Sequence, residues 1–157
     1  GVLKKGKFDE RENLINYLIK KNPHLKFNIF GMNNIQPIWG DEFKRNLFNS
    51  KIALNLSQGK PLKFYSSDRI AQLMGNGIAT LIDKRTQLDK LFSTKEAIFY
   101  KSNKDLNLKL NTMIKNNYIR NKLAKNGRLK YHEKYNSTKI ADFMICKIFK
   151  INKNFDW

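Results

Sequence analysis

The chain has 157 residues, and its 31 Lys and Arg against 13 Asp and Glu give a formal net charge of +18 at pH 7. This length fits one domain, and a hydrophobic fraction of 41% is enough to build a core. No apolar run approaches the ~20 residues of a membrane-spanning helix, and the first residues lack the apolar core of a secretory signal. Cys146 is the only cysteine, which excludes an internal disulfide. We therefore expect a cytoplasmic location.

The positive charge does not choose a partner by itself, because it attracts nucleic acid, anionic lipid and phosphorylated small molecules alike. Basic residues dominate residues 101–132, where Asp105 is the single acid. An alternative explanation is a compositional bias toward Lys, Asn and Ile, with the lysines forming a solvated surface. Either explanation is compatible with the charge, so function has to be inferred from local patterns.

The first half of the chain predicts helices and strands in alternation. Apolar residues at helical spacing predict a helix over 9–21, which the following Asn-Pro pair ends. The stretch 25–30 alternates apolar and mixed residues and predicts a strand. A short helix is expected over 41–49, and an apolar strand over 52–56.

The next unit combines a loop, a helix, a glycine stop and a buried strand. The loop over 57–65 contains Gly and Pro, and apolar residues at helical spacing predict a helix over 67–75. Asn76-Gly77 is a typical helix stop, and the apolar run 78–82 predicts the next strand. This unit has the order of a parallel strand, crossover helix and strand.

The remaining chain continues the alternation and then becomes helical. We expect a short helix over 86–92, a strand over 97–100, and helices from Lys104 to near the end, with residues 138–157 as a C-terminal helix and tail. The alternation predicts an α/β fold, a doubly wound and mainly parallel sheet with helices on both faces. We expect residues 1–157 to form a single domain, the second half of a larger protein.

A candidate binding site lies around the start of the helix over 67–75. Ligands of open parallel sheets bind beyond the carboxyl ends of the strands, and a helix amino terminus offers unpaired N–H groups and partial positive charge to a phosphate. Hydroxyl groups can donate to the phosphate, basic side chains balance its charge, and a Gln one turn into the helix can bond a sugar hydroxyl. The predicted contacts are Lys60, Lys63, Tyr65, Ser66, Ser67, Asp68, Arg69 and Gln72.

The same residues also have a purely structural explanation. Ser67 can cap the helix, Asp68 favours its dipole, and Gly77 ends it in a left-handed conformation. Asn33 and Asn34 follow the first predicted strand and are weaker candidates for a cleft, because they also suit a turn.

The sequence lacks the residue patterns of metal sites, of ATPases and of dinucleotide-dependent dehydrogenases. His24 and His132 are the only histidines, and neither has a Cys or carboxylate at ligand spacing. Cys146 lies in an apolar stripe, which is typical of a buried small hydrophobe. Neither G-x-x-x-x-G-K-[ST] nor G-x-G-x-x-G occurs. We expect no metal ion.

Two segments carry a resemblance to a known family. Residues 67–77, Ser-Asp-Arg-Ile-Ala-Gln-Leu-Met-Gly-Asn-Gly, resemble the S-x-R-x-x-E-x-M-x-x-G segment in the C-terminal half of GT-B glycosyltransferases, in particular the group 1 branch with the spore-maturation-type enzymes. Residues 123–128, Leu-Ala-Lys-Asn-Gly-Arg, with Tyr135 beyond them, are similar to the helix that precedes the C-terminal helix of that family. The resemblance covers most of the chain from about residue 51 to residue 149.

The resemblance implies a Rossmann-like half that binds a nucleotide-sugar donor, with a glycan or lipid-linked acceptor bound by an N-terminal domain outside this chain. Such enzymes stabilise the departing nucleotide with a helix dipole and basic side chains, so no cofactor is expected. The family has a ribose-binding Glu at the position of Gln72, and the second Glu of its retaining members would fall at Phe64. The retaining or inverting outcome stays open. The catalytic base is expected in the acceptor domain, so this chain alone is expected to be inactive.

Two other functions are ranked lower. The first is a basic nucleic-acid-binding α/β domain without enzymatic activity, in which residues 101–134 follow a phosphate backbone. The second is a receiver-like or flavodoxin-like module, ranked last because no Asp pair follows the early strands. Residues 145–157 mix Lys with Ile, Phe and Trp, which predicts packing on a protein domain first and peripheral contact with the inner face of the membrane second.

Overall fold

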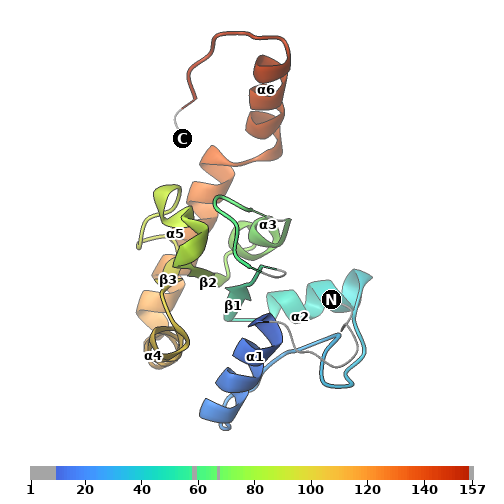
Figure 1. The fold of residues 1–157 in the computed structure, drawn as a ribbon, viewed down its shortest axis with the longest axis vertical. Helices are drawn as coiled ribbons and strands as arrows, with labels where there is room; N and C mark the ends of the chain where they lie inside the picture. Colours follow the sequence, from blue (N-terminus) through green and yellow to red (C-terminus); the bar gives the residue numbers. More distant parts are fainter. Residues whose placement is uncertain (1–9, 58–59, 67, 156–157) are drawn as a thin grey trace.

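The computed structural model describes residues 10–57, 60–66 and 68–155 of the chain (Figure 1). Two helices precede the first strand, a helix connects the first strand to the second, two 3-10 turns connect the second to the third, and three helices follow. The elements are α1 (Glu10–Lys21), α2 (Gly40–Phe48), β1 (Ile52–Asn55), α3 (Asp68–Gly75), β2 (Ala79–Asp83), the 3-10 turns η1 (Lys84–Thr86) and η2 (Leu88–Lys90), β3 (Ile98–Tyr100), α4 (Asn103–Lys115), α5 (Asn117–Lys134) and α6 (Ser137–Ile148).

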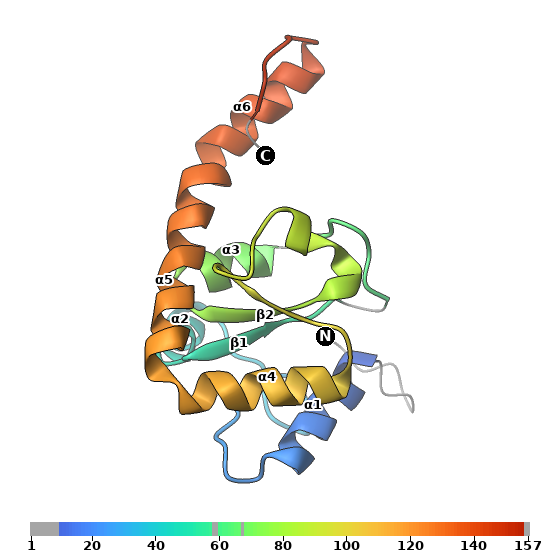
Figure 2. The same cartoon turned by 90° about the vertical axis from the view of Figure 1, so that its left-hand side faces the viewer.

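The three strands form one parallel sheet in the order β1-β2-β3. Leu54 of β1 lies opposite Leu81 of β2, and Leu81 lies opposite Ile98 of β3. All residues of the central strand β2 are buried, as expected for a strand covered on both faces. Figure 2 shows α3 on one side of the sheet and α1 and α4 on the other. This arrangement confirms the predicted α/β fold class.

Each face of the sheet has its own apolar core, because alternate residues of a strand point to opposite faces. The core under α1 and α4 includes Leu14, Leu18, Ala79, Leu81, Ile98, Tyr100, Leu106 and Leu110. The core under α3 includes Ile70, Met74, Ile82, Leu88, Phe92 and Phe99. The two cores together make the layered α/β/α architecture.

Helix α5 closes the end of the sheet at which β2 and β3 begin. A Cβ atom at Gly77, just before β2, would lie 3.5 Å from the side chain of Arg128 in α5. Gly127 approaches Glu96, just before β3, so closely that a Cβ atom would lie 2.6 Å from the Glu96 carbonyl oxygen. Asn126 of α5 also donates to the carbonyl of Lys95 at 3.2 Å. Residues 126–128, part of the second sequence motif, therefore hold α5 against the sheet.

The glycine stop of α3 is confirmed. Gly77 has φ +71°. Its N–H donates to the carbonyl of Met74 at 2.9 Å, and the N–H of Ile78 donates to the carbonyl of Leu73 at 3.0 Å. These bonds satisfy carbonyl groups that a helix end leaves without partners, and they need the left-handed conformation that glycine adopts without strain.

Two predicted elements are wrong. Residues 26–30 are irregular rather than a strand. Leu25 and Phe27 still pack against the core under α1 and α4, so the alternating pattern reflects burial. A strand also needs a neighbouring strand with which it can pair. The helix predicted over 86–92 is replaced by the turns η1 and η2, which are separated by Gln87 at φ 55°. A left-handed residue at this point interrupts any continuous helix.

Helix α6 extends away from the α/β layers, and Figures 1 and 2 show it beyond the end of α5. Its N-cap is Asn136, whose side chain accepts the N–H of Lys139 at 3.0 Å. Among the residues that the structure describes, no helix combines the length and apolar character needed to cross a bilayer.

Candidate functional site

The carboxyl ends of the strands meet at one edge of the sheet, opposite α5. The loop after β1, the turn η1 after β2 and the start of α4 after β3 all leave from this edge. Helix α3 also begins at this edge. The guanidinium of Arg69, in the first turn of α3, donates to the carbonyl of Leu56, directly after β1. The predicted position of the α3 amino terminus, behind the carboxyl end of a strand, is therefore the observed one.

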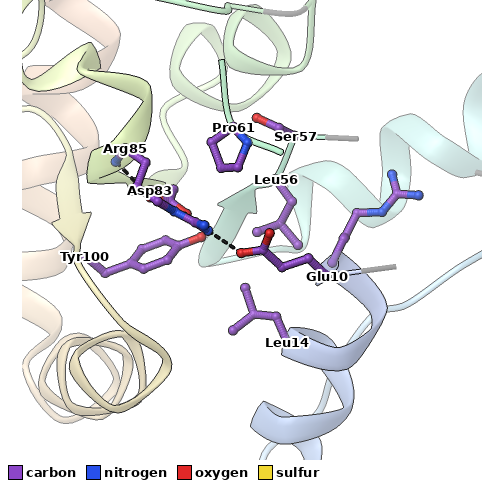
Figure 3. A pocket seen from close by; sticks show the side chains of 9 residues that line it. Glu10, Leu14, Leu56, Ser57, Pro61, Asp83, Arg85 and Tyr100 are labelled. Carbon is purple, nitrogen blue, oxygen red and sulfur yellow. Dashed lines mark hydrogen bonds and ion pairs between the residues drawn. The ribbon is translucent and has the colours of Figure 1, made fainter. Parts of the chain in front are cut away.

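A cluster of charged side chains joins the end of β2 to the start of α1 (Figure 3). The carboxylate of Asp83 accepts the backbone N–H of Arg85 at 2.8 Å and the guanidinium of Arg85 at 2.7 and 3.0 Å. The same guanidinium pairs with Glu10. Hydrogen bonds from Arg85 to Asp83 first, and to Glu10 second, raise the pKa of Arg85 above its ordinary value. The guanidinium is thus a fixed positive charge between two carboxylates.

Tyr100, the last residue of β3, lies beside this cluster. Its side chain is buried, and Asp83 is its register neighbour on β2. Burial raises the pKa of the Tyr100 hydroxyl strongly, and the negative charge of Asp83 adds to the effect. The hydroxyl is therefore neutral at physiological pH and can act as a hydrogen-bond donor.

Two adjoining pockets open at this edge, and we refer to them together as the edge pocket. They share Glu10, Leu14, Asp83, Arg85 and Tyr100 as lining residues. The first pocket extends to the loop after β1, where Leu56, Ser57 and Pro61 line it. The second extends to the start of α4, where Lys101, Ser102 and Asn103 line it together with Asn13 of α1. The lining combines carboxylate, guanidinium, amide and hydroxyl groups with the apolar side chains of Leu14, Leu56 and Pro61.

The residues predicted as ligand contacts lie at the same edge but do not line the edge pocket, as far as the described residues show. Ser67 lies outside the described residues. Of the others, Lys60, Lys63, Tyr65, Ser66 and Asp68 are exposed, whereas Arg69 and Gln72 are half-buried. Pro61, within the same loop, is the point where this surface meets the edge pocket.

The loop before α3 is tied to the turn after β2. The N–H of Phe64, a residue at φ 56°, donates to the carbonyl of Thr86 at 2.7 Å. The ammonium of Lys63 lies 5.2 Å from the centre of the Phe64 ring. Phe64 therefore anchors the loop by its backbone, while its neighbouring basic side chain stays at the surface.

Sequence reasoning did not identify Glu10, Asp83, Arg85 or Tyr100 as neighbours in one site. A signal was available for two of them, because Asp83 and Tyr100 end adjacent predicted strands and so reach the same edge. No pattern in the sequence connects Glu10 with Arg85, which is 75 positions away. The candidates Asn33 and Asn34 both have positive φ, 53° and 61°, as expected for a turn.

The described residues contain no group of three or more His, Cys, Asp or Glu side chains that could hold a metal ion. The two carboxylates of the edge pocket both pair with Arg85. The polar groups of the pocket can bind an uncharged polar ligand such as a sugar, while the helix start and the basic loop beside it suit an anion.

Comparison with known proteins identifies the family. A family model described as "glycosyl transferase-like" matches residues 11–145. The comparisons with curated proteins and with solved structures found no match. The matched range contains every described strand and all of the candidate site except Glu10. The family supports glycosyl transfer in general, with a sugar donor and an acceptor. The chain therefore belongs to the glycosyl transferase-like family.

Proposed function

We propose that this chain is the donor-binding half of a GT-B glycosyltransferase of the group 1, spore-maturation-type branch, and that it binds a nucleotide-sugar at the carboxyl edge of its sheet. The proposal rests on one observation, which is that the amino terminus of α3 and the edge pocket lie at the same edge of the sheet. A glycan or lipid-linked acceptor binds to a further domain. Because that domain supplies the catalytic base in this proposal, the chain alone transfers no sugar.

The phosphates of the donor bind at the start of α3. The first backbone N–H groups of a helix have no partner within it, and the helix dipole adds partial positive charge. Arg69 is held here by its bond to the Leu56 carbonyl, and a guanidinium has further N–H groups that this bond does not use. Lys60 and Lys63 add positive charge from the loop. These groups stabilise the departing nucleotide without a metal ion.

The ribose and the sugar bind on either side of the phosphates. Gln72 lies one turn into α3 and is half-buried, and its side-chain amide bonds a ribose hydroxyl in our proposal. The sugar enters the edge pocket, where Tyr100 provides a neutral hydroxyl and Asn13 and Asn103 provide amides. Sugar hydroxyls both donate and accept hydrogen bonds, so this mixed lining is chemically suited to them.

To test the proposal, the 157-residue chain is titrated with UDP, GDP, CMP and a short DNA duplex at two salt concentrations. Binding is measured by NMR or by the shift in the thermal unfolding midpoint. We expect one nucleotide to bind at both salt concentrations. Replacing Arg69 by Ala should weaken its binding about tenfold, the equivalent of losing one charge-assisted hydrogen bond. The control is Arg45→Ala in α2, an exposed arginine at another element.

Two results would contradict the proposal. A response to DNA alone, lost steeply as salt rises, would favour the nucleic-acid-binding alternative. Equal weakening by Arg69→Ala and Arg45→Ala would show that binding depends on total charge and not on the start of α3.

A further inference from the structure

Tyr100 is buried, yet its hydroxyl faces the edge pocket. Only 3% of the residue is exposed, and it lines both parts of the pocket. Figure 3 shows its side chain directed toward Arg85 and Glu10. No described residue forms a hydrogen bond with the Tyr100 hydroxyl. A polar group that is held in one position without a protein partner is suited to a ligand that supplies the bond.

The charged groups beside Tyr100 leave further donor and acceptor atoms unused. We call Glu10, Asp83 and Arg85 the Arg85 cluster. Arg85 binds Asp83 through Nε, at 3.0 and 3.1 Å, and through Nη2, at 2.7 Å. Its Nη2 also pairs with Oε1 of Glu10. Nη1 of Arg85 and Oε2 of Glu10 form no bond with a described residue. The cluster and Tyr100 therefore offer a ligand two kinds of donor and a carboxylate acceptor.

This combination of groups distinguishes between classes of sugar. A sugar hydroxyl both donates and accepts, so it can accept from Tyr100 or Arg85 and donate to Glu10. The carboxylate of an acidic sugar only accepts, and at this position it would lie against the carboxylates of Glu10 and Asp83. The ammonium of an amino sugar only donates, and it would meet the guanidinium of Arg85. An uncharged sugar is the class that can use all of these groups without repulsion.

The rest of the lining leaves this selection in place. Arg11 and Lys101 also line the pocket but are not part of the Arg85 cluster. Arg11 has an interaction partner within the protein, and Lys101 is exposed, so that solvent screens its charge. The part of the pocket that reaches α4 has a volume of about 620 Å³, within the range of small-molecule sites. One sugar ring can therefore reach the cluster.

We propose that the edge pocket selects an uncharged sugar, with Tyr100 and Glu10 as the residues that determine this specificity. The Tyr100 hydroxyl and Nη1 of Arg85 donate to sugar oxygens, and a sugar hydroxyl donates to Oε2 of Glu10. This inference rests on the proposed function, because the sugar reaches the pocket as part of a nucleotide-sugar. It adds the class of the transferred sugar, which is a neutral hexose and not an acidic or amino sugar.

The experiment compares each nucleotide with its sugar conjugates by calorimetric titration of the 157-residue chain. The probes are UDP with UDP-glucose, UDP-galactose, UDP-glucuronate and UDP-glucosamine, GDP with GDP-mannose and GDP-mannuronate, and CMP with CMP-sialate. We expect one neutral conjugate to bind about tenfold more tightly than its nucleotide alone. The charged conjugates of that nucleotide should bind at least about tenfold more weakly than the neutral one.

Two conservative variants locate the selection. Tyr100→Phe keeps the buried ring and removes the hydroxyl, so it should abolish the roughly tenfold gain from the neutral sugar. The matched control is Tyr118→Phe in α5, since Tyr118 is 73% exposed and does not line the pocket. Glu10→Gln removes the negative charge while keeping the shape of the side chain. It should narrow the difference between the neutral and the acidic conjugate to about threefold or less.

Failure of this inference can be told apart from failure of the proposed function. If none of the three nucleotides binds, the donor site itself is refuted and the sugar selection with it. If a nucleotide binds but no neutral sugar adds affinity, or a charged conjugate binds as tightly as the neutral one, the selection alone is overturned. Equal losses in Tyr100→Phe and Tyr118→Phe also overturn it. An equal loss for the nucleotide and its conjugate in Tyr100→Phe does the same, because it would show a merely structural effect.

Discussion

Single side chains at the carboxyl edge hold together parts of the chain that are distant in sequence. Arg85 connects Asp83 at the end of β2 with Glu10 at the start of α1. Asp83 is buried, whereas the side chains of Arg85 and Glu10 are 55% and 52% exposed. A buried carboxylate without its partner is costly, whereas an exposed ion pair contributes little. Asp83 is therefore the residue of the cluster on which stability depends most.

We predict that Asp83→Asn lowers the free energy of unfolding by about 1–3 kcal/mol, because the charge-assisted bonds from Arg85 become ordinary ones. Urea unfolding measures the change. The control is Asp41→Asn, which breaks the exposed pair of Asp41 with Lys44 and should cost less than about 0.5 kcal/mol. Equal costs for the two variants would show that the cluster does not depend on the buried position of Asp83.

At the scale of elements, the sequence was most informative where one local signal decides the structure. The apolar spacing within α1, the glycine at residue 77 and the apolar run of β2 each gave a correct element. The strand predicted over 25–30 was wrong because strand formation depends on a partner elsewhere in the chain. The edge pocket escaped prediction for the same reason, since its residues come from α1, from the ends of β2 and β3 and from the segments that follow the three strands. The position of the α3 start was predictable because it follows from the order of strand and helix.

The contact of α5 with the sheet predicts an unusual result for a glycine-to-alanine change. Ala is the better helix former, yet a Cβ at residue 127 would lie 2.6 Å from the Glu96 carbonyl oxygen. Gly127→Ala should therefore destabilise the protein by about 1–3 kcal/mol. Gly75→Ala is the control, because its Cβ would meet Tyr131 at an ordinary 3.5 Å. Thermal unfolding compares the two, and a stabilised Gly127→Ala variant would contradict the close approach.

The start of α4 predicts a dependence of stability on pH. A hydrogen bond from Lys109 first, and the backbone N–H of Lys101 second, lower the pKa of Asp105 below its ordinary value. A carboxylate whose pKa is lower in the folded state stabilises the protein above its unfolded pKa, about 3.9, and this contribution is lost as pH falls through the folded value. The difference in stability between the wild type and Asp105→Asn should therefore shrink as the pH falls below about 3.9, the unfolded pKa. Urea unfolding measures it, and a constant difference would contradict the prediction.

The whole molecule consists of a layered α/β part and a projecting C-terminal part. Both apolar cores lie within the layers, and helix α5 contributes Leu123 to one core and packs Tyr131 against the other. Among the described residues, neither core includes a residue of α6. The cooperative unit of folding is therefore expected to end with α5.

A chain that stops after Asn136 tests this expectation. We predict that its midpoint of thermal unfolding differs from that of the 157-residue chain by less than about 4 °C, since the contact of Tyr135 with Phe92 is retained. Differential scanning calorimetry measures the midpoint. A larger decrease would show that α6 belongs to the same cooperative unit as the layers.

The placement of α5 at the beginning of β2 and β3 has a consequence for how such a protein can diversify. Helix α5 packs on the end of the sheet where β2 and β3 begin, and close backbone contacts such as that at Gly127 tolerate little change in side-chain size. The loops at the carboxyl edge of the sheet are held in place by side chains and by a few backbone hydrogen bonds, such as that from Phe64 to Thr86. Mutations in those loops can therefore alter which molecule is recognised while the scaffold behind them remains intact.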